Sequence, residues 1–311
     1  MNRAFVSLAL AGLTVSVSAT WSLTPVSATS VPPTSEPAEI ADSFPPVEDA
    51  SRIIPVNGDI AEVVYALDLG DQIVATDISA TYPDEANDTT KIGYQRTLTA
   101  ETILAFEPTV VIADDRAGPP EVFDSIRAAG VDVVIIQHHA DLQAPAYKIR
   151  AIASTLDVTD AGETLVRTFE DELAAGLAVA DAGVSASGRP LVLALYLRGE
   201  GMQLVFGAGS GIDAVVEAAG AVNAGTEMGV VDNGELSTES IIEAAPDYLL
   251  VTTTGLESVG GIDGLLVQPG LAETPAGEHR RVLVFEDQFL YGLGPRTGQL
   301  VADLAEQIHT P

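Results

Sequence analysis

The sequence predicts an α/β protein of two lobes, each with a mostly parallel sheet and flanking helices, joined by one long rigid helix. Three observations support this prediction. Short β-like runs alternate with amphipathic segments, which is typical of parallel sheets covered by helices. A single long helical stretch divides the chain near its middle. A motif of the first half also recurs 138 residues later, from Leu98 to Leu236.

Composition limits the class of protein. The chain has 311 residues, of which 47% are hydrophobic and 19% charged, so it can bury a sizeable core and two compact units are the default expectation. It has no cysteine, which excludes disulfides, thiolate metal sites and a lipid-modified cysteine anchor. Its net charge of −31 repels phosphates, so we expect no nucleic-acid partner and attribute the acidity to a solvated surface.

The N-terminal part reads as an export signal followed by a tether. Residues 1–28 combine Arg3, an apolar stretch and small residues, which predicts a signal peptide; the stretch is shorter than the roughly 20 residues of a membrane span. Residues 29–50 are rich in Pro, Ser and Thr and predict a disordered linker. We expect the protein to be exported, to the periplasm or the outer face of the cytoplasmic membrane.

The rest of the chain divides into an N-terminal lobe over residues 51–156, a connecting helix over residues 157–188 and a C-terminal lobe over residues 189–311. Apolar residues at helical spacing, among them Val166 and Phe169, support the helix. The strands we expect are residues 52–55, 73–75, 109–113 and 131–136 in the first lobe, and 191–197, 248–252 and 282–285 in the second.

The repeat supports two related lobes. Leu98-Thr99-Ala100-Glu101 is matched by Leu236-Ser237-Thr238-Glu239, and a proline precedes the next apolar run in both copies. In each copy a Ser or Thr is placed to cap a helix, and the glutamate is favoured near the positive end of that helix. Two similar lobes leave a cleft between them, where ligands usually bind.

Three segments carry a family resemblance: residues 92–101 (Ile-Gly-Tyr-Gln-Arg-Thr-Leu-Thr-Ala-Glu), residues 206–223 and residues 292–297. With them the chain resembles the solute-binding proteins of bacterial haem ABC importers, in the helical-strut class that also carries vitamin B12 and ferric siderophores. The resemblance covers residues 52–308. It implies a class III periplasmic-binding-protein-like fold, haem b as the transported ligand, and an ABC permease with its ATPase as partners of a monomeric protein.

The same resemblance makes Tyr94 the axial ligand of haem iron. A phenolate is a hard anionic donor that suits ferric iron and is a recognised haem ligand. A free tyrosine has a pKa of about 10, so binding as phenolate needs help, which the Arg96 guanidinium is placed to give. The alternative is that Tyr94 is a surface turn residue and Arg96 a solvated cation.

The sequence also offers candidates for further contacts with haem. Arg198 and Arg296 are candidates for the two haem propionates, because a cation must overcome the repulsion of so acidic a protein. His138 or His139, after a predicted strand, is a candidate iron ligand, although loop histidines are usually plain surface residues.

A second axial ligand from the C-terminal lobe is left open. Met228 and Tyr196 are candidates for a contact with haem there. The chain has Met228-Gly229-Val230 where many proteins of the resembling family have a tyrosine, and this leaves any sixth iron ligand in doubt.

Glu101 and Glu239 occupy matching positions of the repeat. In the resembling class, one glutamate on each lobe docks onto arginines of the permease, and a two-fold permease can engage both lobes only if each presents a similar charge. Such charges steer encounter and fix register. The simpler reading, that both stabilise helix N-termini, is compatible with docking.

We expect a binding protein and not an enzyme. The sequence has no Walker-type loop, no His-Glu-x-x-His pair and no cysteine cluster, and the glycine-rich residues 207–211 have no evident histidine partner for a serine nucleophile. Two alternatives stay open. One is a ferric siderophore or corrinoid binder of the same class, and the other is a non-transport protein of the cell envelope.

Overall fold

The computed structural model describes residues 44–199, 202–235 and 237–309, which belong to one compact unit. The predicted signal peptide and residues 29–43 of the predicted linker lie outside the described residues. No helix among the described residues is long and apolar enough to cross a membrane.

The N-lobe is built on three parallel strands in the order β1-β2-β3. Ile53 of β1 pairs with Val110 of β2, which in turn pairs with Asp132 of β3. Its elements are β1 (Ile53–Pro55), α1 (Gly58–Ala66), the 3-10 turn η1 (Gly70–Gln72), α2 (Asp84–Asp88), α3 (Ala100–Leu104), β2 (Val110–Asp114), α4 (Pro120–Ala128), β3 (Asp132–Ile136) and α5 (Ala144–Thr155).

The C-lobe has a mixed sheet in the order β7-β5-β4-β8-β9, with β6 paired to β4. Strands β4, β6, β8 and β9 run parallel, whereas β5 is antiparallel to β4 and β7. Its elements are β4 (Leu191–Arg198), β5 (Met202–Phe206), α7 (Gly211–Ala218), β6 (Val222–Asn223), α8 (Ala224–Glu227), β7 (Asn233–Gly234), α9 (Thr238–Ala244), β8 (Tyr248–Thr252), α10 (Thr253–Ser258), α11 (Gly261–Leu266), α12 (Pro275–Glu278), β9 (Val282–Phe285), α13 (Asp287–Tyr291) and α14 (Thr297–His309).

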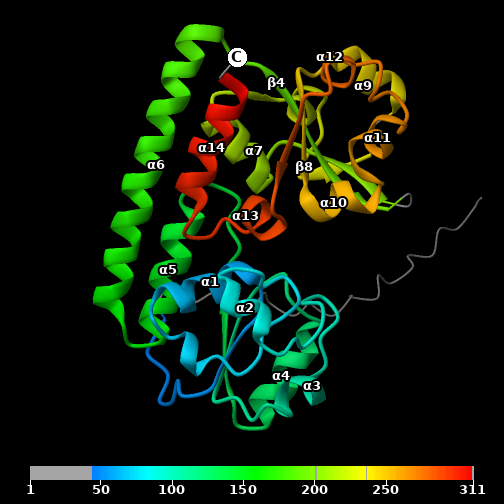
Figure 1. Cartoon of the computed structure of the whole chain (residues 1–311). Helices are drawn as coiled ribbons and strands as arrows, with labels where there is room; N and C mark the ends of the chain where they lie inside the picture. The colour runs from blue at the N-terminus through cyan, green and yellow to red at the C-terminus, as the bar shows by residue number, and fades with distance from the viewer. Residues whose placement is uncertain (1–43, 200–201, 236, 310–311) are drawn as a thin grey trace, which may run out of the picture. The chain divides into compact units, whose positions relative to one another are not determined.

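Helix α6 (Thr159–Ser187) joins the two lobes and packs against α5 of the N-lobe and α14 of the C-lobe (Figure 1). Glycines allow α6 and α14 to approach closely. A methyl group on Gly298 of α14 would lie 2.4 Å from the backbone nitrogen of Leu173, and one on Gly176 of α6 would lie 2.8 Å from the carbonyl oxygen of Gly298. The expected fold, two α/β lobes joined by one long helix, is confirmed.

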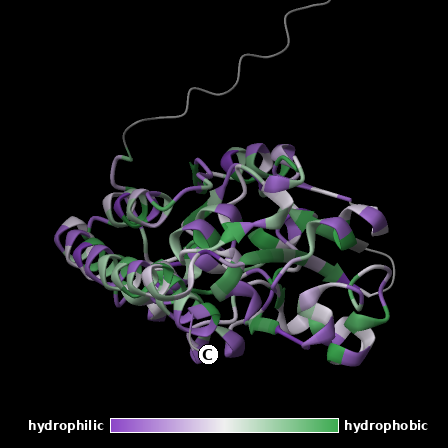
Figure 2. Ribbon diagram, turned by 90° about the horizontal axis from the view of Figure 1, so that it is seen from above, coloured by the Kyte–Doolittle hydropathy of each residue, from purple (hydrophilic) through white to green (hydrophobic). Residues whose placement is uncertain are grey.

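Apolar strands fill the interior of both lobes, and Figure 2 shows hydrophobic strands in the middle of the described chain. In β1, Ile53 packs toward α1, α5 and α6, whereas Ile54 packs on the opposite face with residues of α3 and α4. Both side chains are fully buried. Burial on both faces explains why these strands read as continuous aliphatic runs and not as alternating ones.

The internal repeat is present in the backbone. Thr99 caps the N-terminus of α3 and Ser237 caps that of α9, and each hydroxyl accepts the backbone N–H three residues on, at 3.3 and 3.1 Å. Both helices are followed by a residue in the left-handed region, Glu107 with φ of 47° and Ala245 with φ of 50°. The two motifs therefore share their N-terminal caps and a left-handed residue at the matching position, although α3 ends two residues earlier in the motif than α9.

Two strand expectations need correction. Residues 73–75 do not form a strand, because only Ile73 bridges to β1 and the chain then pairs Thr76 with Lys91. Strands β5 and β7 were not predicted, because their antiparallel pairing follows a turn near Gly199 and β7 has only two residues.

The first described residues also differ from the expectation of a linker to residue 50. Phe44 packs edge-on against the Tyr147 ring of α5, with centroids 6.0 Å apart, and its carbonyl accepts the Ser154 hydroxyl. Val47 N donates to Thr155 O at 3.0 Å. Residues 44–50 therefore lie on α5, because Phe44 and Val47 supply apolar contacts that a solvated linker lacks.

Candidate functional site

The loops that leave the carboxyl ends of the N-lobe strands carry polar side chains. Asp114 ends β2 and is followed by Asp115 and Arg116, and His138 and His139 follow β3. Carboxyl ends of parallel strands lie at one edge of a sheet, and ligands of open α/β sheets bind outside that edge. These loops therefore form the edge of the N-lobe where a ligand site is expected.

The loop with Tyr94 is tied to this edge. Ile78 N donates to Gly93 O at 3.0 Å, and Gly118 N donates to Gln95 O at 2.8 Å. The Tyr94 side chain is 42% exposed, and its phenol has no hydrogen bond to another described residue. Tyr94 thus extends from a backbone that is fixed on both sides.

Arg96 is exposed, and its guanidinium forms no ion pair or hydrogen bond with another described residue. The sequence analysis did not predict that two apolar side chains near this loop would be exposed. These are Ile78 and Tyr82, which are 53% and 41% exposed. A possible signal was the position of Ile78 directly after a buried aspartate in a loop. Ile78, Tyr82 and Tyr94 together give the loops an apolar surface.

Buried carboxyl groups support these loops. Asp77 accepts the backbone N–H groups of Asn57 and Ser79, at 2.9 and 3.0 Å, and burial raises its pKa. Burial also raises the pKa of Asp114, although the Arg116 guanidinium, 3.2 Å away, acts in the opposite direction. The loops are therefore held by hydrogen bonds at their base.

His138 and His139 have different surroundings. Burial, with the positive charges of Arg116 and Lys148, lowers the pKa of His138 to about 4. Its imidazole is therefore neutral at pH 7, the form that can bind a metal. His139 packs edge-on against Tyr147, with ring centroids 4.7 Å apart.

The carboxyl edge of the C-lobe holds Arg198, the last residue of β4. Its guanidinium pairs with Asp287 at 2.9 Å and lies 4.7 Å from the centre of the Tyr196 ring. Tyr196 in turn contacts Phe206 and Tyr291, with centroids 6.3 and 5.9 Å apart. Burial raises the pKa of Tyr291, so its phenol stays protonated.

Arg296 joins the two lobes. Its guanidinium donates two hydrogen bonds of 2.9 Å to the Glu62 carboxylate of α1 and stacks on the Tyr82 ring, 3.6 Å from the ring centre. Gln288, just after β9, donates to Gly58 O at 2.9 Å and accepts Thr81 N at 2.7 Å. Residues that follow the strand ends of both lobes therefore contact each other.

A buried ion pair adds to this contact. The Lys148 ammonium of α5 pairs with Asp59 of α1, and both side chains are largely buried. It also donates to the carbonyls of Gly292 and Leu293 in the C-lobe, at 3.0 and 3.1 Å. The sequence offered no sign of this contact, because its partners lie far apart along the chain.

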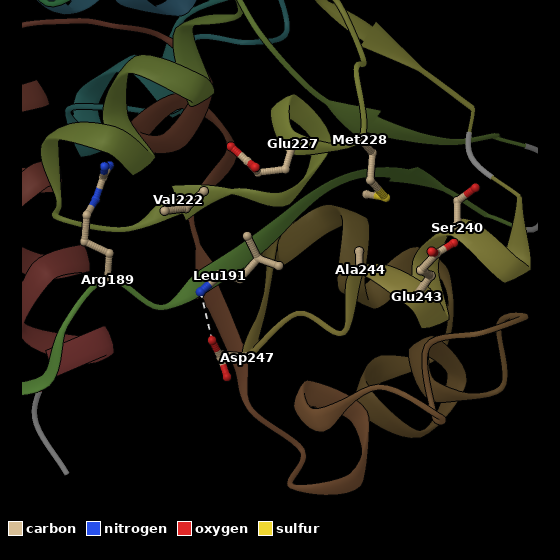
Figure 3. A pocket seen from close by; sticks show the side chains of 9 residues that line it. All are labelled: Arg189, Leu191, Val222, Glu227, Met228, Ser240, Glu243, Ala244 and Asp247. Carbon is tan, nitrogen blue, oxygen red and sulfur yellow. Dashed lines mark hydrogen bonds between the residues drawn. The ribbon is translucent and has the colours of Figure 1, made fainter.

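The remaining predicted residues lie elsewhere. Met228 lines a pocket of the C-lobe beside Leu191, which begins the strand that Arg198 ends, so the structure does not bring Met228 and Arg198 together (Figure 3). Glu101 and Glu239 are exposed, each the second residue of its helix, α3 and α9. Figure 1 places these two helices on the side of the described chain away from α6.

Comparison with known proteins identifies the family. The sequence matches the model of the family described as periplasmic binding protein over residues 53–288. The chain belongs to the periplasmic binding protein family.

Solved structures of other periplasmic binding proteins match closely. The periplasmic heme-binding protein RhuT from Roseiflexus sp. RS-1, in apo form, is 46% identical with a TM-score of 0.81, covering 84% of this chain and 98% of RhuT. The periplasmic heme-binding protein BhuT, in complex with two hemes, is 36% identical with a TM-score of 0.75, covering 83% of this chain and 97% of BhuT.

Curated relatives of this periplasmic binding protein match over shorter stretches. The vitamin B12-binding protein of Vibrio parahaemolyticus is 27% identical over 128 residues, which is 41% of this chain. The match spans less than half of that relative, 46% of its length.

Proposed function

We propose that this periplasmic binding protein captures haem between its lobes and delivers it to an ABC permease with its ATPase. The observation that carries the proposal is the exposed Tyr94 phenol, held on a fixed loop at the carboxyl edge of the N-lobe sheet. Likeness over nearly the whole of two periplasmic heme-binding proteins supports it. We further propose export, a monomer and no catalytic activity.

Tyr94 is the proposed axial ligand of the haem iron. A phenolate oxygen is a hard anionic donor, and ferric iron is a hard cation that binds it well. The phenol has no hydrogen-bond partner among the described residues, so no such bond has to be broken when iron binds. Ile78 and Tyr82, exposed on neighbouring loops, offer apolar contact to a macrocycle.

Arg96 is the cation best placed for the proposed ligand. It lies two residues from Tyr94, and it has no ion pair within the described chain. Arg198 and Arg296 stay candidates for the propionates, but Asp287 and Glu62 already hold them. A propionate at either arginine would have to compete with a carboxylate of the protein itself.

His138 is the proposed second iron ligand, ahead of His139 and Met228. Its pKa of about 4 leaves the imidazole neutral at pH 7, so a nitrogen lone pair is free to bind iron. His139 is packed on Tyr147, and Met228 lines the pocket near Leu191. Tyr196, beside Arg198, stays a candidate for a contact from the C-lobe.

A hemin titration of the purified protein tests the proposal. We expect one saturable absorption change of the tyrosinate type, which Tyr94→Phe abolishes because the phenyl ring has no oxygen. Tyr82→Phe is the matched control, since its side chain is almost equally exposed and sits on a neighbouring loop. An unchanged spectrum in Tyr94→Phe would remove Tyr94 from the site.

A corrinoid is the second candidate ligand, since the curated relatives are named as vitamin B12-binding proteins. The stretch they share with this chain is short, and this favours haem. Titration with cobalamin beside hemin separates the two. Tight cobalamin binding that survives loss of Tyr94 would favour the corrinoid.

A further inference from the structure

One cavity of the C-lobe has no part in the proposed haem site. It has a volume of 680 Å³ and is lined by Arg189, Leu191, Val222, Glu227, Met228, Ser240, Glu243, Ala244 and Asp247. In the view of Figure 3, Glu227 and Met228 lie above Leu191 and Ala244, and Ser240 and Glu243 lie to the right of Ala244. The internal repeat indicates what this cavity accepts.

Leu191 occupies in the C-lobe the position that Arg52 has in the N-lobe. Arg52 N donates to the Thr109 hydroxyl at 3.1 Å, and Leu191 N donates to the Asp247 carboxylate at 2.9 Å. The return bonds also match, since Thr109 N donates to Arg52 O and Asp247 N to Leu191 O, at 2.9 and 2.8 Å. The two strand entrances are therefore equivalent, and only the side chains differ.

The Arg52 side chain covers the end of α3. Its Nε donates to Glu107 O at 2.8 Å, and its Nη2 donates to Phe106 O at 2.5 Å. Both carbonyls lie in the turn that follows α3, whose last residue is Leu104, and a cation near the C-terminal end of a helix is favoured. In the N-lobe a guanidinium of the protein itself therefore satisfies these acceptors.

In the C-lobe the matching carbonyls belong to Ala244 and Ala245. Ala245 has the same left-handed backbone as Glu107, so the turn is equivalent. The Leu191 side chain has no donor, and no hydrogen bond among the described residues is donated to either carbonyl. Ala244 lines the cavity. The cavity therefore lies where the N-lobe holds its guanidinium.

The charge of the cavity also favours a cation. Its lining has three carboxylates, Glu227, Glu243 and Asp247, against the single guanidinium of Arg189. That guanidinium is engaged elsewhere, because it donates to Ala221 O and pairs with Glu217 at 3.7 Å. An incoming cation thus meets a net negative lining.

We propose that this cavity accepts an arginine side chain of the importer's permease. The inference rests on the proposed function, and Glu239 connects the two. Glu239 and Glu243 are four residues apart on α9 and therefore share a helix face, and Glu243 lines the cavity, so the cavity adjoins the surface proposed for docking. The planar fork of a guanidinium donates to two carbonyls and a carboxylate together, which the point charge of a lysine does less well.

Leu191→Arg tests the proposal by filling the cavity from within, as Arg52 does in the N-lobe. We expect its affinity for the permease–ATPase complex in nanodiscs to fall at least about tenfold, with hemin binding unchanged. Leu191→Met, similar in size and uncharged, should bind like wild type. Because Leu191 is partly buried, Glu243→Arg at an exposed position provides a second variant, with Glu306→Arg on α14 as its charge-matched control.

Wild-type affinity in both Leu191→Arg and Glu243→Arg would overturn the inference. If Glu239→Arg alone then lost binding, the proposed docking would stand without the cavity. An absence of hemin binding would instead count against the proposed function. In that case the cavity is tested alone with N-acetylarginine amide up to about 20 mM. Shifts of the Ala244 and Ala245 amide signals in NMR, absent in Leu191→Arg, support a guanidinium site, and no shift refutes it.

Discussion

Glu62 and Arg296 form a two-bond ion pair between α1 of the N-lobe and the turn before α14 of the C-lobe, with both distances at 2.9 Å. The Glu62 side chain is 5% exposed and that of Arg296 is 22% exposed. Stacking on the Tyr82 ring fixes the guanidinium further. The pair thus joins residues 234 positions apart in the sequence.

Arg296→Met should destabilise the folded protein. It leaves Glu62 buried without its cation, and we expect the free energy of unfolding to fall by about 3 kcal/mol. Urea denaturation measures this. The double variant Glu62→Met with Arg296→Met should recover much of the loss, because no unpaired charge remains. A single variant with the wild-type midpoint would contradict the prediction.

His138 should make the apo protein less stable in acid. Its pKa of about 4 lies below the ordinary value of 6.5, because burial and the charges of Arg116 and Lys148 outweigh those of Asp59 and Asp115. Between pH 6.5 and pH 4, His138 is therefore protonated in the unfolded chain and neutral in the folded chain. The contribution of His138 to stability is full above pH 6.5 and is lost as the pH falls toward 4.

His138→Gln should flatten this dependence. Between pH 7 and pH 4 the free energy of unfolding of the variant should fall by about 1–2 kcal/mol less than that of wild type, allowing for the partial exposure of the ring. Urea midpoints at a series of pH values measure the slope. His279→Gln, at an exposed position, serves as control. Parallel curves for wild type and His138→Gln would refute the assignment.

Gly298→Ala should weaken the contact of α14 with α6. The added methyl would lie 2.4 Å from Leu173 N, so the helices must move apart, at a cost of about 2 kcal/mol. Helix propensity alone predicts the opposite sign, a gain of about 1 kcal/mol. Urea denaturation decides between them. Gln299→Ala, at the exposed next position, should have little effect. A more stable Gly298→Ala would show that α6 and α14 have room for the added methyl group.

Charge reversal at Glu101 or Glu239 should weaken docking onto the permease and leave the hemin spectrum unchanged. Each glutamate is exposed at the second position of its helix, so Glu101→Arg and Glu239→Arg should fold normally. Rim charges act mostly on the association rate, so each variant should associate about tenfold more slowly at low salt, and less so at high salt. Surface plasmon resonance with the complex in nanodiscs measures this. Unchanged rates in the double variant would leave these glutamates only their favourable charge at the helix N-termini.

Much of the fold could be predicted because burial on both faces leaves a plain signal. The aliphatic runs of β2 and β9 and the capped helix starts at Thr99 and Ser237 were predicted at or near their observed positions. Strand β5 was not, since hairpin pairing depends on a turn that the residue pattern does not define.

The site was harder to predict because its contacts are long-range. No local pattern links Glu62 to Arg296 or Lys148 to Leu293, and these pairs are decided by how the strand-end loops meet. The exposure of Ile78 is likewise a property of the folded loop. Tyr94 could be singled out only because its neighbours in the sequence form a recognisable segment.

The close seam between α6 and α14 has a mechanical consequence. Since α6 is a continuous helix of 29 residues, packed on α14 at one lobe and on α5 at the other, a change in the angle between the lobes must strain the helix itself. Such strain opposes large hinge motions of the two lobes. A membrane complex would then distinguish the ligand-bound protein from the ligand-free protein by the surface exposed at the lobe rims, and not by the extent of lobe closure.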